Sequence, residues 1–244
     1  MIIFPIFCYT VLESDKKMDK WITTTDQVKI YYSVCGHGPA LIFLHGNLQT
    51  GRVFKKQVAY FSKKYTCLTI DTRAHGRSFF DGERLVFSRL AQDVFDVMNQ
   101  ENLQKADLIG FSDGANIAMV LASEHPDRFS RLVLNAGNLT TKGIYFALRF
   151  FFFVTTHLLN WLKISRPTLQ LLTQNTGLEM SDLSRITAQT LILIGQFDVV
   201  KYAHAYEMST FIPDSKLIVA PLATHLFFYF QPKRFNKLID QFLS

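Results

Sequence analysis

The hydrophobic positions of this chain follow two alternating patterns. Short runs of apolar residues, typical of strands buried on both faces, occupy residues 40–44, 66–70, 106–111, 131–134, 190–194 and 216–220. Segments with helical spacing lie between them, at roughly residues 51–63, 85–101, 114–124, 201–210 and 233–243. Residues 28–34 instead alternate at period two, as a half-exposed antiparallel strand does. The pattern predicts an α/β fold, with a doubly wound, mostly parallel sheet that one antiparallel hairpin enters.

One interval interrupts this alternation. Between about residues 135 and 189 two helical patterns follow each other without a strand, which is too long for an ordinary connection. We predict a helical cap over residues 135–189, inserted into a core of residues 18–134 and 190–244. Residues 143–162 are apolar enough for three interpretations, namely a membrane span, a membrane-touching surface and a lid over a pocket. Arg149 and His157 would be costly at bilayer depth, so the lid is favoured and stable membrane insertion is not expected.

Residues 1–17 stand apart from the predicted fold. They are apolar up to Leu12 but lack the basic start and small-residue cleavage site of a secretory signal. Met18 is a natural second start, so residues 1–17 are predicted to be a loose leader or a translation-start artefact.

Composition narrows the class of protein. Hydrophobic residues make up 48% of the 244 residues and charged residues 19%, which is typical of a globular protein and not of a disordered one. The net charge of +6 is modest and its cations are scattered, so nucleic-acid binding is not expected. Cys8, Cys35 and Cys67 lack metal-ligand and redox spacing, which favours thiols in a reducing, cytoplasmic compartment. Nothing in the composition indicates an oligomeric state.

A serine in a glycine-flanked turn is the first candidate for chemistry. Ser112 lies between a predicted strand and a predicted helix, with Gly110 and Gly114 two residues away on either side. A nucleophile at such a turn needs a strained backbone, and a Cβ at either glycine would collide with the neighbouring strand or helix. Ser112 is therefore predicted to be a catalytic nucleophile.

Two later residues could activate this serine. Asp198 and His225 each follow a predicted strand, and the carboxyl ends of parallel strands meet at one edge of a sheet. A neutral imidazole can take the serine proton, and a carboxylate can orient that imidazole. We predict that Asp198 and His225 complete a triad with Ser112. Asp182 and Asp214 are rival acids, and Asp198 could instead cap the following helix.

Acyl transfer also needs hydrogen-bond donors for the developing oxyanion. The backbone N–H of Asp113 lies at a predicted helix start, and Asn47 lies in a turn after a predicted strand, following His45 and Gly46. The N–H groups of Asn47 and Asp113 are the predicted oxyanion hole, with the Asn47 side-chain amide as an alternative donor.

With these segments the chain resembles the α/β-hydrolase superfamily over about residues 22–242. The matching motifs occur in the family's order, at residues 44–47, 71–78, 110–115, 195–198 and 224–225. The resemblance implies a structural turn at residues 71–78, in which Asp71 and Arg73 hold loops and His75 is not catalytic. Thr224 departs from the glycine that many relatives have before the histidine.

The resemblance also implies an activity. It predicts a serine hydrolase that cleaves carboxylic esters of small-molecule substrates through an acyl-enzyme, with no metal or organic cofactor. The same triad would serve a C–C hydrolase, lactonase, thioesterase or amidase. A binding protein without catalysis is the alternative from another class, and such proteins usually lose a triad member.

The substrate pocket is predicted from Asp113 and from apolar residues. Members similar to biphenyl-hydrolase-like valacyclovirases carry Ser-Asp-Gly at this turn, where the aspartate binds a substrate α-amino group. Asp113 could therefore favour aminoacyl esters, or it could simply stabilise the positive end of its helix. Leu48, Tyr145, Phe146 and Phe150 are predicted to line a pocket for a small to medium apolar group, although these aromatic residues could instead pack the cap against the sheet.

Overall fold

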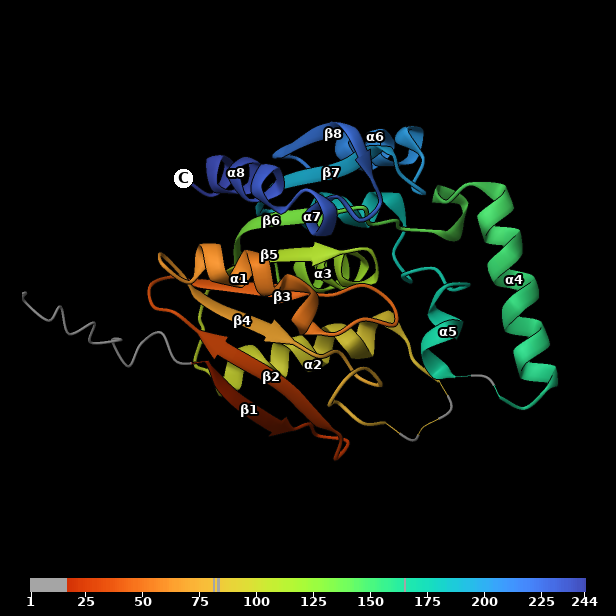
Figure 1. Ribbon diagram of the computed structural model, residues 1–244, viewed down its shortest axis with the longest axis horizontal. Coiled ribbons are helices and arrows are strands. Elements are labelled where there is room, and N and C mark those ends of the chain that lie inside the picture. Colours follow the sequence, from red (N-terminus) through yellow and green to blue (C-terminus); the bar gives the residue numbers. More distant parts are fainter. Residues whose placement is uncertain (1–16, 81, 83, 165) are drawn as a thin grey trace, which may run out of the picture.

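The computed structural model describes residues 17–80, 82, 84–164 and 166–244 (Figure 1). All but the last residue of the predicted leader lies outside the described residues. The described strands form one sheet in the order β1-β2-β4-β3-β5-β6-β7-β8. Their bounds are β1 (Met18–Thr23), β2 (Lys29–Cys35), β3 (Ala40–Leu44), β4 (Thr66–Ile70), β5 (Ala106–Phe111), β6 (Phe129–Asn135), β7 (Gln189–Phe197) and β8 (Ser215–Thr224).

The pairing of the strands confirms the predicted architecture. Strand β2 pairs antiparallel with both β1 and β4. Every other neighbouring pair, from β4 and β3 to β7 and β8, is parallel. The carboxyl ends of β3, β5, β6, β7 and β8 therefore reach one edge of the sheet, where the loops that follow them can meet.

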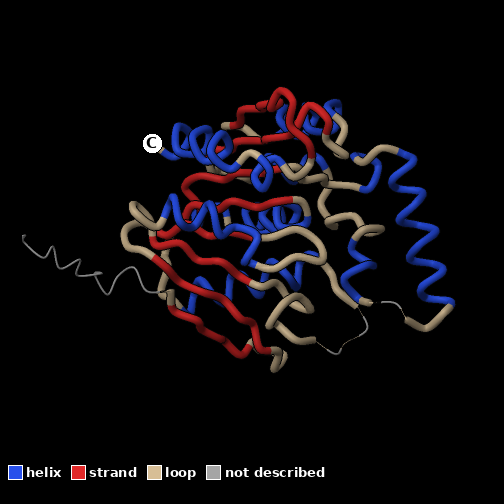
Figure 2. The backbone as a smooth tube through the Cα atoms, viewed as in Figure 1, coloured by secondary structure: helices blue, strands red, loops and turns tan. Residues whose placement is uncertain are grey.

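Helices cover both faces of the sheet, and Figure 2 shows the strands as one layer between them. On one face lie α1 (Lys55–Phe61), α7 (Phe227–Phe230) and α8 (Pro232–Leu243), whose buried residues share an apolar cluster with β3 and β5. On the other face lie α2 (Phe87–Gln100), α3 (Asp113–Glu124) and α6 (Tyr202–Phe211), which form a larger cluster with β2, β4 and β6. Two buried layers thus hold the sheet rigid beneath its carboxyl edge.

Two strand expectations were wrong because of sheet order, and one strand was missed. Strand β2 is not half-exposed: residues 30–34 are all buried, because β1 takes the edge position beside it. Half of the residues of β1 are polar and only Ile22 is buried, so this strand was not predicted. Strand β8 is only partly buried, because it is the last strand and pairs with β7 alone.

The connection from β6 to β7 contains α4 (Phe146–Trp161) and α5 (Pro167–Leu171). Both helices lie beyond the carboxyl edge, on the side to which β5 points (Figure 1). The end of this connection returns to the main body, where Leu183 and Ile186 join the cluster of α3 and α6. In the described part of the chain, no helix is long and apolar enough to cross a membrane.

Candidate active site

Ser112 occupies a strained turn between β5 and α3. Its backbone has φ 52° and ψ −119°, a conformation that costs a non-glycine residue about 1–3 kcal/mol. The glycines on either side are required by space. A Cβ at Gly110 would lie 2.4 Å from the Gly114 carbonyl oxygen, and one at Gly114 would lie 2.1 Å from the Leu44 carbonyl oxygen. The turn therefore lifts the Ser112 hydroxyl above the sheet edge while its flanks pack against backbone.

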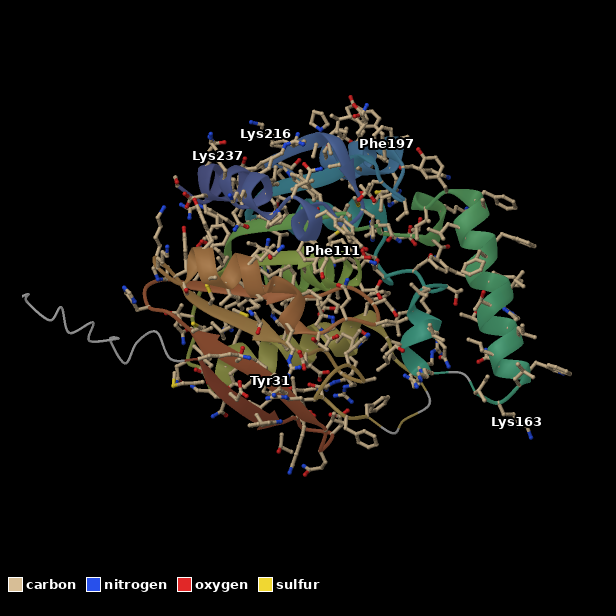
Figure 3. The ribbon with its side chains drawn as sticks, in the orientation of Figure 1. Tyr31, Phe111, Lys163, Phe197, Lys216 and Lys237 are labelled. Atoms are coloured by element: carbon tan, nitrogen blue, oxygen red, sulfur yellow. The ribbon has the colours of Figure 1, made fainter. Side chains whose placement is uncertain are left out.

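Ser112, His225 and Asp198 form one chain of hydrogen bonds. The Ser112 Oγ lies 3.2 Å from His225 Nε2, and His225 Nδ1 lies 2.8 Å from Asp198 Oδ1. The Gly195 N–H donates to Asp198 Oδ2 at 2.9 Å, which fixes the carboxylate. The ring of Phe111, labelled in Figure 3, packs against the imidazole with centroids 4.9 Å apart. The structure thus brings together three predicted residues that follow three different strands.

The alternative roles for the acid do not fit the geometry. Asp182 caps a short 3₁₀ turn, where its carboxylate accepts the Glu179 N–H and pairs with Arg185. Asp214 precedes β8, at the opposite edge of the sheet from the loop that holds Asp198. Helix α6 begins after Lys201 with no side-chain cap, so Asp198 does not cap it.

The turn after β3 passes directly against Ser112. A Cβ at Gly46 would lie 3.1 Å from the Ser112 Cβ and 3.0 Å from the Phe111 ring, so glycine makes this close approach easy. The Asn47 side-chain amide donates to Asp113 Oδ2 and to the Thr168 carbonyl oxygen of α5, both at 2.7 Å. That amide is therefore engaged in joining three segments, and the backbone N–H of Asn47 stays the predicted oxyanion donor.

His45 fixes this turn from beneath. The Thr72 N–H donates to His45 Nε2 at 3.0 Å, so Nδ1 carries the proton and donates to the Gly46 carbonyl oxygen at 2.8 Å. Burial, together with the charge that His75 would carry, lowers the pKa of His45 to about 3. A permanently neutral imidazole thus ties the turn after β3 to the turn after β4.

The segment at residues 71–78 is structural, as predicted. The Asp71 carboxylate accepts the N–H groups of Gly51 and Arg77 at 2.8 and 3.0 Å. The buried Arg73 guanidinium pairs with Asp26 and Asp93, both at 2.7 Å. These bonds hold the loops around the β4 end in place without reaching Ser112.

A cavity of about 350 Å³ opens over Ser112. Its polar lining includes Asn47, Gln49, Asp113, Asn116, Asn138 and Gln174. Its apolar lining includes Leu48, Phe111, Ile144, Leu148, Phe152, Leu171, Leu172, Val199, Val200 and Leu226. Leu48 and Asp113 therefore lie where the sequence predicts them, and most of the remaining wall is aliphatic or aromatic.

The three predicted aromatic pocket residues were wrong. Tyr145, Phe146 and Phe150 do not line the cavity, and each is more than half exposed. Leu148 and Phe152 of α4 line it instead, spaced four residues apart on the inner face of the helix. Ile144, Leu148 and Phe152 follow one another at intervals of four residues, and this spacing could have indicated the helix face that lines the cavity. It was hidden because the neighbouring residues of α4 are equally apolar.

Asp113 is the first residue of α3 and lies at the cavity wall. Burial raises the pKa of its carboxyl to about 6, against the hydrogen bond from Asn47 and the charge of His225, which lower it. A carboxylate at a helix N-terminus is also favoured by the helix dipole. Asp113 is therefore a buried acid that changes charge near pH 6.

Known proteins are similar to this chain in sequence and in fold. The family model described as alpha/beta hydrolase fold matches residues 39–156. The AB hydrolase superfamily protein YisY of Bacillus subtilis is 26% identical over 92% of this chain and 99% of its own. The serine hydrolase BPHL of Mus musculus is 25% identical over 89% and 84%. Naproxen esterase from Bacillus subtilis shares the fold with a TM-score of 0.78, at 18% identity over 94% and 92%.

The fold and these relatives define a class of protein, the hydrolases, in which a strand-turn-helix presents a nucleophile at the carboxyl edge of a parallel sheet. The chain belongs to the α/β-hydrolase superfamily.

Proposed function

We propose that this hydrolase cleaves carboxylic esters through an acyl-enzyme formed on Ser112. The observation that supports the proposal is the hydrogen-bonded chain from Ser112 Oγ through His225 to the buried Asp198, at the floor of a mostly apolar cavity. Nucleophile, base and orienting acid all lie within hydrogen-bond reach, which is the geometry that such a reaction needs.

Each residue has one role in the proposed reaction. His225 Nε2 takes the proton of Ser112 Oγ while that oxygen bonds to the ester carbonyl carbon. The tetrahedral intermediate then expels the alcohol, which leaves with the proton from His225. His225 then deprotonates a water molecule, which attacks the acyl carbon of the acyl-enzyme. The acid is released as Ser112 Oγ leaves with the proton from His225. Asp198 holds the imidazole in the tautomer required and stabilises its positive charge.

The backbone N–H groups of Asn47 and Asp113 are the proposed donors to the oxyanion. The support comes from the Gly46 approach to Ser112 and from the position of Asp113 at the start of α3. Each preorganised donor of this kind lowers the barrier by about 3 kcal/mol. His45 and the Asn47 side chain would keep the first donor in place.

The cavity favours esters with a small to medium apolar group. Leu148, Phe152 and Leu171 offer apolar contacts, and a volume of about 350 Å³ fits a short acyl chain or a single ring. Naproxen esterase, which shares this fold, supports an ester as the substrate.

A substrate panel tests the proposal. The wild type is assayed on p-nitrophenyl esters of increasing chain length, with thioester, lactone and anilide analogues of the best acyl group. We expect the highest kcat/KM for a short or medium ester, and its loss in Ser112→Ala with unchanged thermal unfolding. Inactivity on every ester, with activity on a C–C bond or an anilide, would replace the proposed reaction.

Asp113 supports a second candidate substrate, an aminoacyl ester. Its carboxyl lies at the cavity wall and ionises above about pH 6, so it could pair with a substrate ammonium group. We expect Asp113→Asn to lower hydrolysis of an aminoacyl ester much more than that of the matched ester without the amine. The wild-type ratio of the two rates should also fall below pH 6. A ratio that is the same in both proteins excludes this role.

A further inference from the structure

Helix α4 carries large apolar side chains on its inner face and on most of its outer face. Its inner face contributes Leu148 and Phe152 to the cavity over Ser112. Its outer face and flanks leave large apolar side chains in solvent, and these are Tyr145, Phe146, Phe150, Phe151, Phe153, Val154, Leu158, Trp161, Leu162 and Ile164. We call this set the outer α4 surface. It lies at the extreme side of the molecule, away from the sheet (Figure 1).

Such exposure is unusual for a helix of this composition. Helices that are apolar all round are normally buried, and contiguous exposed apolar patches mark sites of interaction. Trp161 is 78% exposed, Phe146 66% and Phe151 60%. The outer α4 surface is therefore expected to be covered in the working protein.

The charges around the surface indicate what covers it. The sequence has no acidic residue between Asp127 and Glu179. Within that interval three cations lie on α4 or within four residues of its ends, and they are Lys142, Arg149 and Lys163. Figure 3 shows Lys163 at the outer end of the helix, pointing away from the body. The surface is thus apolar at its centre and positive at its margins, with no negative charge of its own.

We propose that the outer α4 surface docks on an anionic lipid bilayer, with α4 lying in the plane of the interface. Apolar side chains would enter the acyl boundary while the cations meet lipid phosphates, as in other interfacial helices. Tyr145 and Trp161, at the two ends of α4, are of the residue types enriched at membrane–water interfaces. A second copy of this chain fits less well, because pairing two such surfaces would oppose cation to cation.

Docking would also bear on the substrate. Since the opposite face of α4 lines the cavity, a docked molecule holds that cavity beside the lipid phase. This consequence rests on the proposed function: the ester would be an apolar one that partitions into membranes. The docking itself does not depend on the chemistry at Ser112.

The two tryptophans of the chain allow a direct test. Trp161 belongs to the outer α4 surface, whereas Trp21 is half-exposed on β1 at the far edge of the sheet. Trp21→Phe leaves Trp161 as the only tryptophan, and Trp161→Phe leaves Trp21 as the matched control. With vesicles of phosphatidylcholine and phosphatidylserine, we expect Trp161 emission to shift to the blue and to be quenched by brominated acyl chains. Trp21 emission should stay unchanged.

Two further kinds of variant separate the apolar and electrostatic contributions. Phe151→Ser should weaken vesicle binding about tenfold, because one phenylalanine no longer leaves water. Lys142→Gln and Lys163→Gln should each weaken it about fivefold on phosphatidylserine vesicles. On vesicles of phosphatidylcholine alone, neither lysine variant should change the weaker binding. All three variants should hydrolyse a dissolved short ester at the wild-type rate, which shows that the fold is intact.

Three results would overturn the proposal. The protein could fail to sediment with phosphatidylserine vesicles, or it could bind them without any change in Trp161 emission. Alternatively, Trp161 emission could shift with protein concentration in the absence of lipid, together with a dimer in sedimentation velocity. That last result would assign the outer α4 surface to a second copy of the chain.

Discussion

The turn at Ser112 and helix α4 face the same cavity, yet the fold constrains them very differently. At the turn, a Cβ at position 110 or 114 would come within 2.4 Å of backbone atoms, which excludes every residue but glycine there. Along α4, Leu148 and Phe152 line the cavity, while the side chains of the outer α4 surface are about half exposed or more. Neighbouring atoms restrict the residue types at the Ser112 turn from all sides, whereas they restrict those of α4 from its inner face only.

This difference in packing corresponds to two functions, the proposed reaction at Ser112 and the access of substrate past α4. A nucleophile needs its position fixed within a fraction of an ångström, and Ser112, the proposed nucleophile, lies on a tight turn between two buried elements. The segment that decides what reaches the nucleophile lies outside the sheet and can vary in shape and surface. Substitutions at the turn should therefore lower activity or stability, and substitutions in α4 should change substrate preference.

The largest expected effect is on the chemistry. Ser112→Ala removes the nucleophile and should lower ester hydrolysis about 10⁴-fold or more. Because alanine at φ 52° has the same backbone strain as serine, the thermal unfolding midpoint should stay close to the wild-type value. The measurement is kcat/KM on the best p-nitrophenyl ester, together with calorimetry. Full activity in this variant would show that Ser112 is not the nucleophile.

The next effect is on stability. Gly114→Ala places a methyl group 2.1 Å from the Leu44 carbonyl oxygen, which must move the β3 end or the start of α3. We expect a loss of about 3 kcal/mol in the free energy of unfolding, measured by urea titration. Phe151→Ala on the outer α4 surface is the control and should change it little. Equal losses in the two variants would contradict the contrast between the regions.

A third effect has a pH dependence with a defined sign. The pKa of Asp113 is about 6 in the folded protein, above its ordinary value of 3.8, so the folded state holds the proton more tightly. Its ionisation therefore destabilises the folded protein as pH rises through 4 to 6. Asp113→Asn should be about 2 kcal/mol more stable than wild type at pH 8, and this gain should shrink below pH 6. If Asp113→Asn raised the free energy of unfolding equally at pH 5 and pH 8, burial of the Asp113 charge would not be the cause of the gain.

The smallest effect distinguishes the two faces of α4. Leu148→Ala enlarges the cavity and should change the ratio of kcat/KM between a medium and a short ester about tenfold. Phe150→Ala, two residues away on the outer face, should leave that ratio unchanged. Two equal changes would mean that α4 rotates or refolds when substrate binds.

Site positions that are packed on all sides could be predicted from the sequence. Glycines at 110 and 114, a serine between them, and polar residues after the strands that end near 197 and 224 leave few alternatives in a parallel sheet. Asp198 and His225 lie next to each other because β7 and β8 are neighbours and parallel. The alternation of strands and helices predicts that arrangement.

The pocket residues of α4 and the burial of the strands near the sheet edges could not be predicted from the sequence. In α4 large apolar residues occur on both the inner and the outer face, so hydrophobic spacing could not tell Leu148 and Phe152 from Phe146 and Phe150. The burial of β2 and the exposure of β8 depend on which strands take the edges, and strand order is not contained in a local pattern. The link from Asn47 to Thr168 joins residues 121 positions apart and needs the three-dimensional fold.

The central claim is that Ser112 is the activated nucleophile, and labelling with a fluorophosphonate tests it most directly. The reagent reacts with a serine only where a base and oxyanion donors activate it. We predict one adduct per molecule, located on Ser112 by peptide mapping, and almost none in His225→Ala under the same conditions. An adduct on another residue, or no adduct in the folded wild-type protein, would contradict the account.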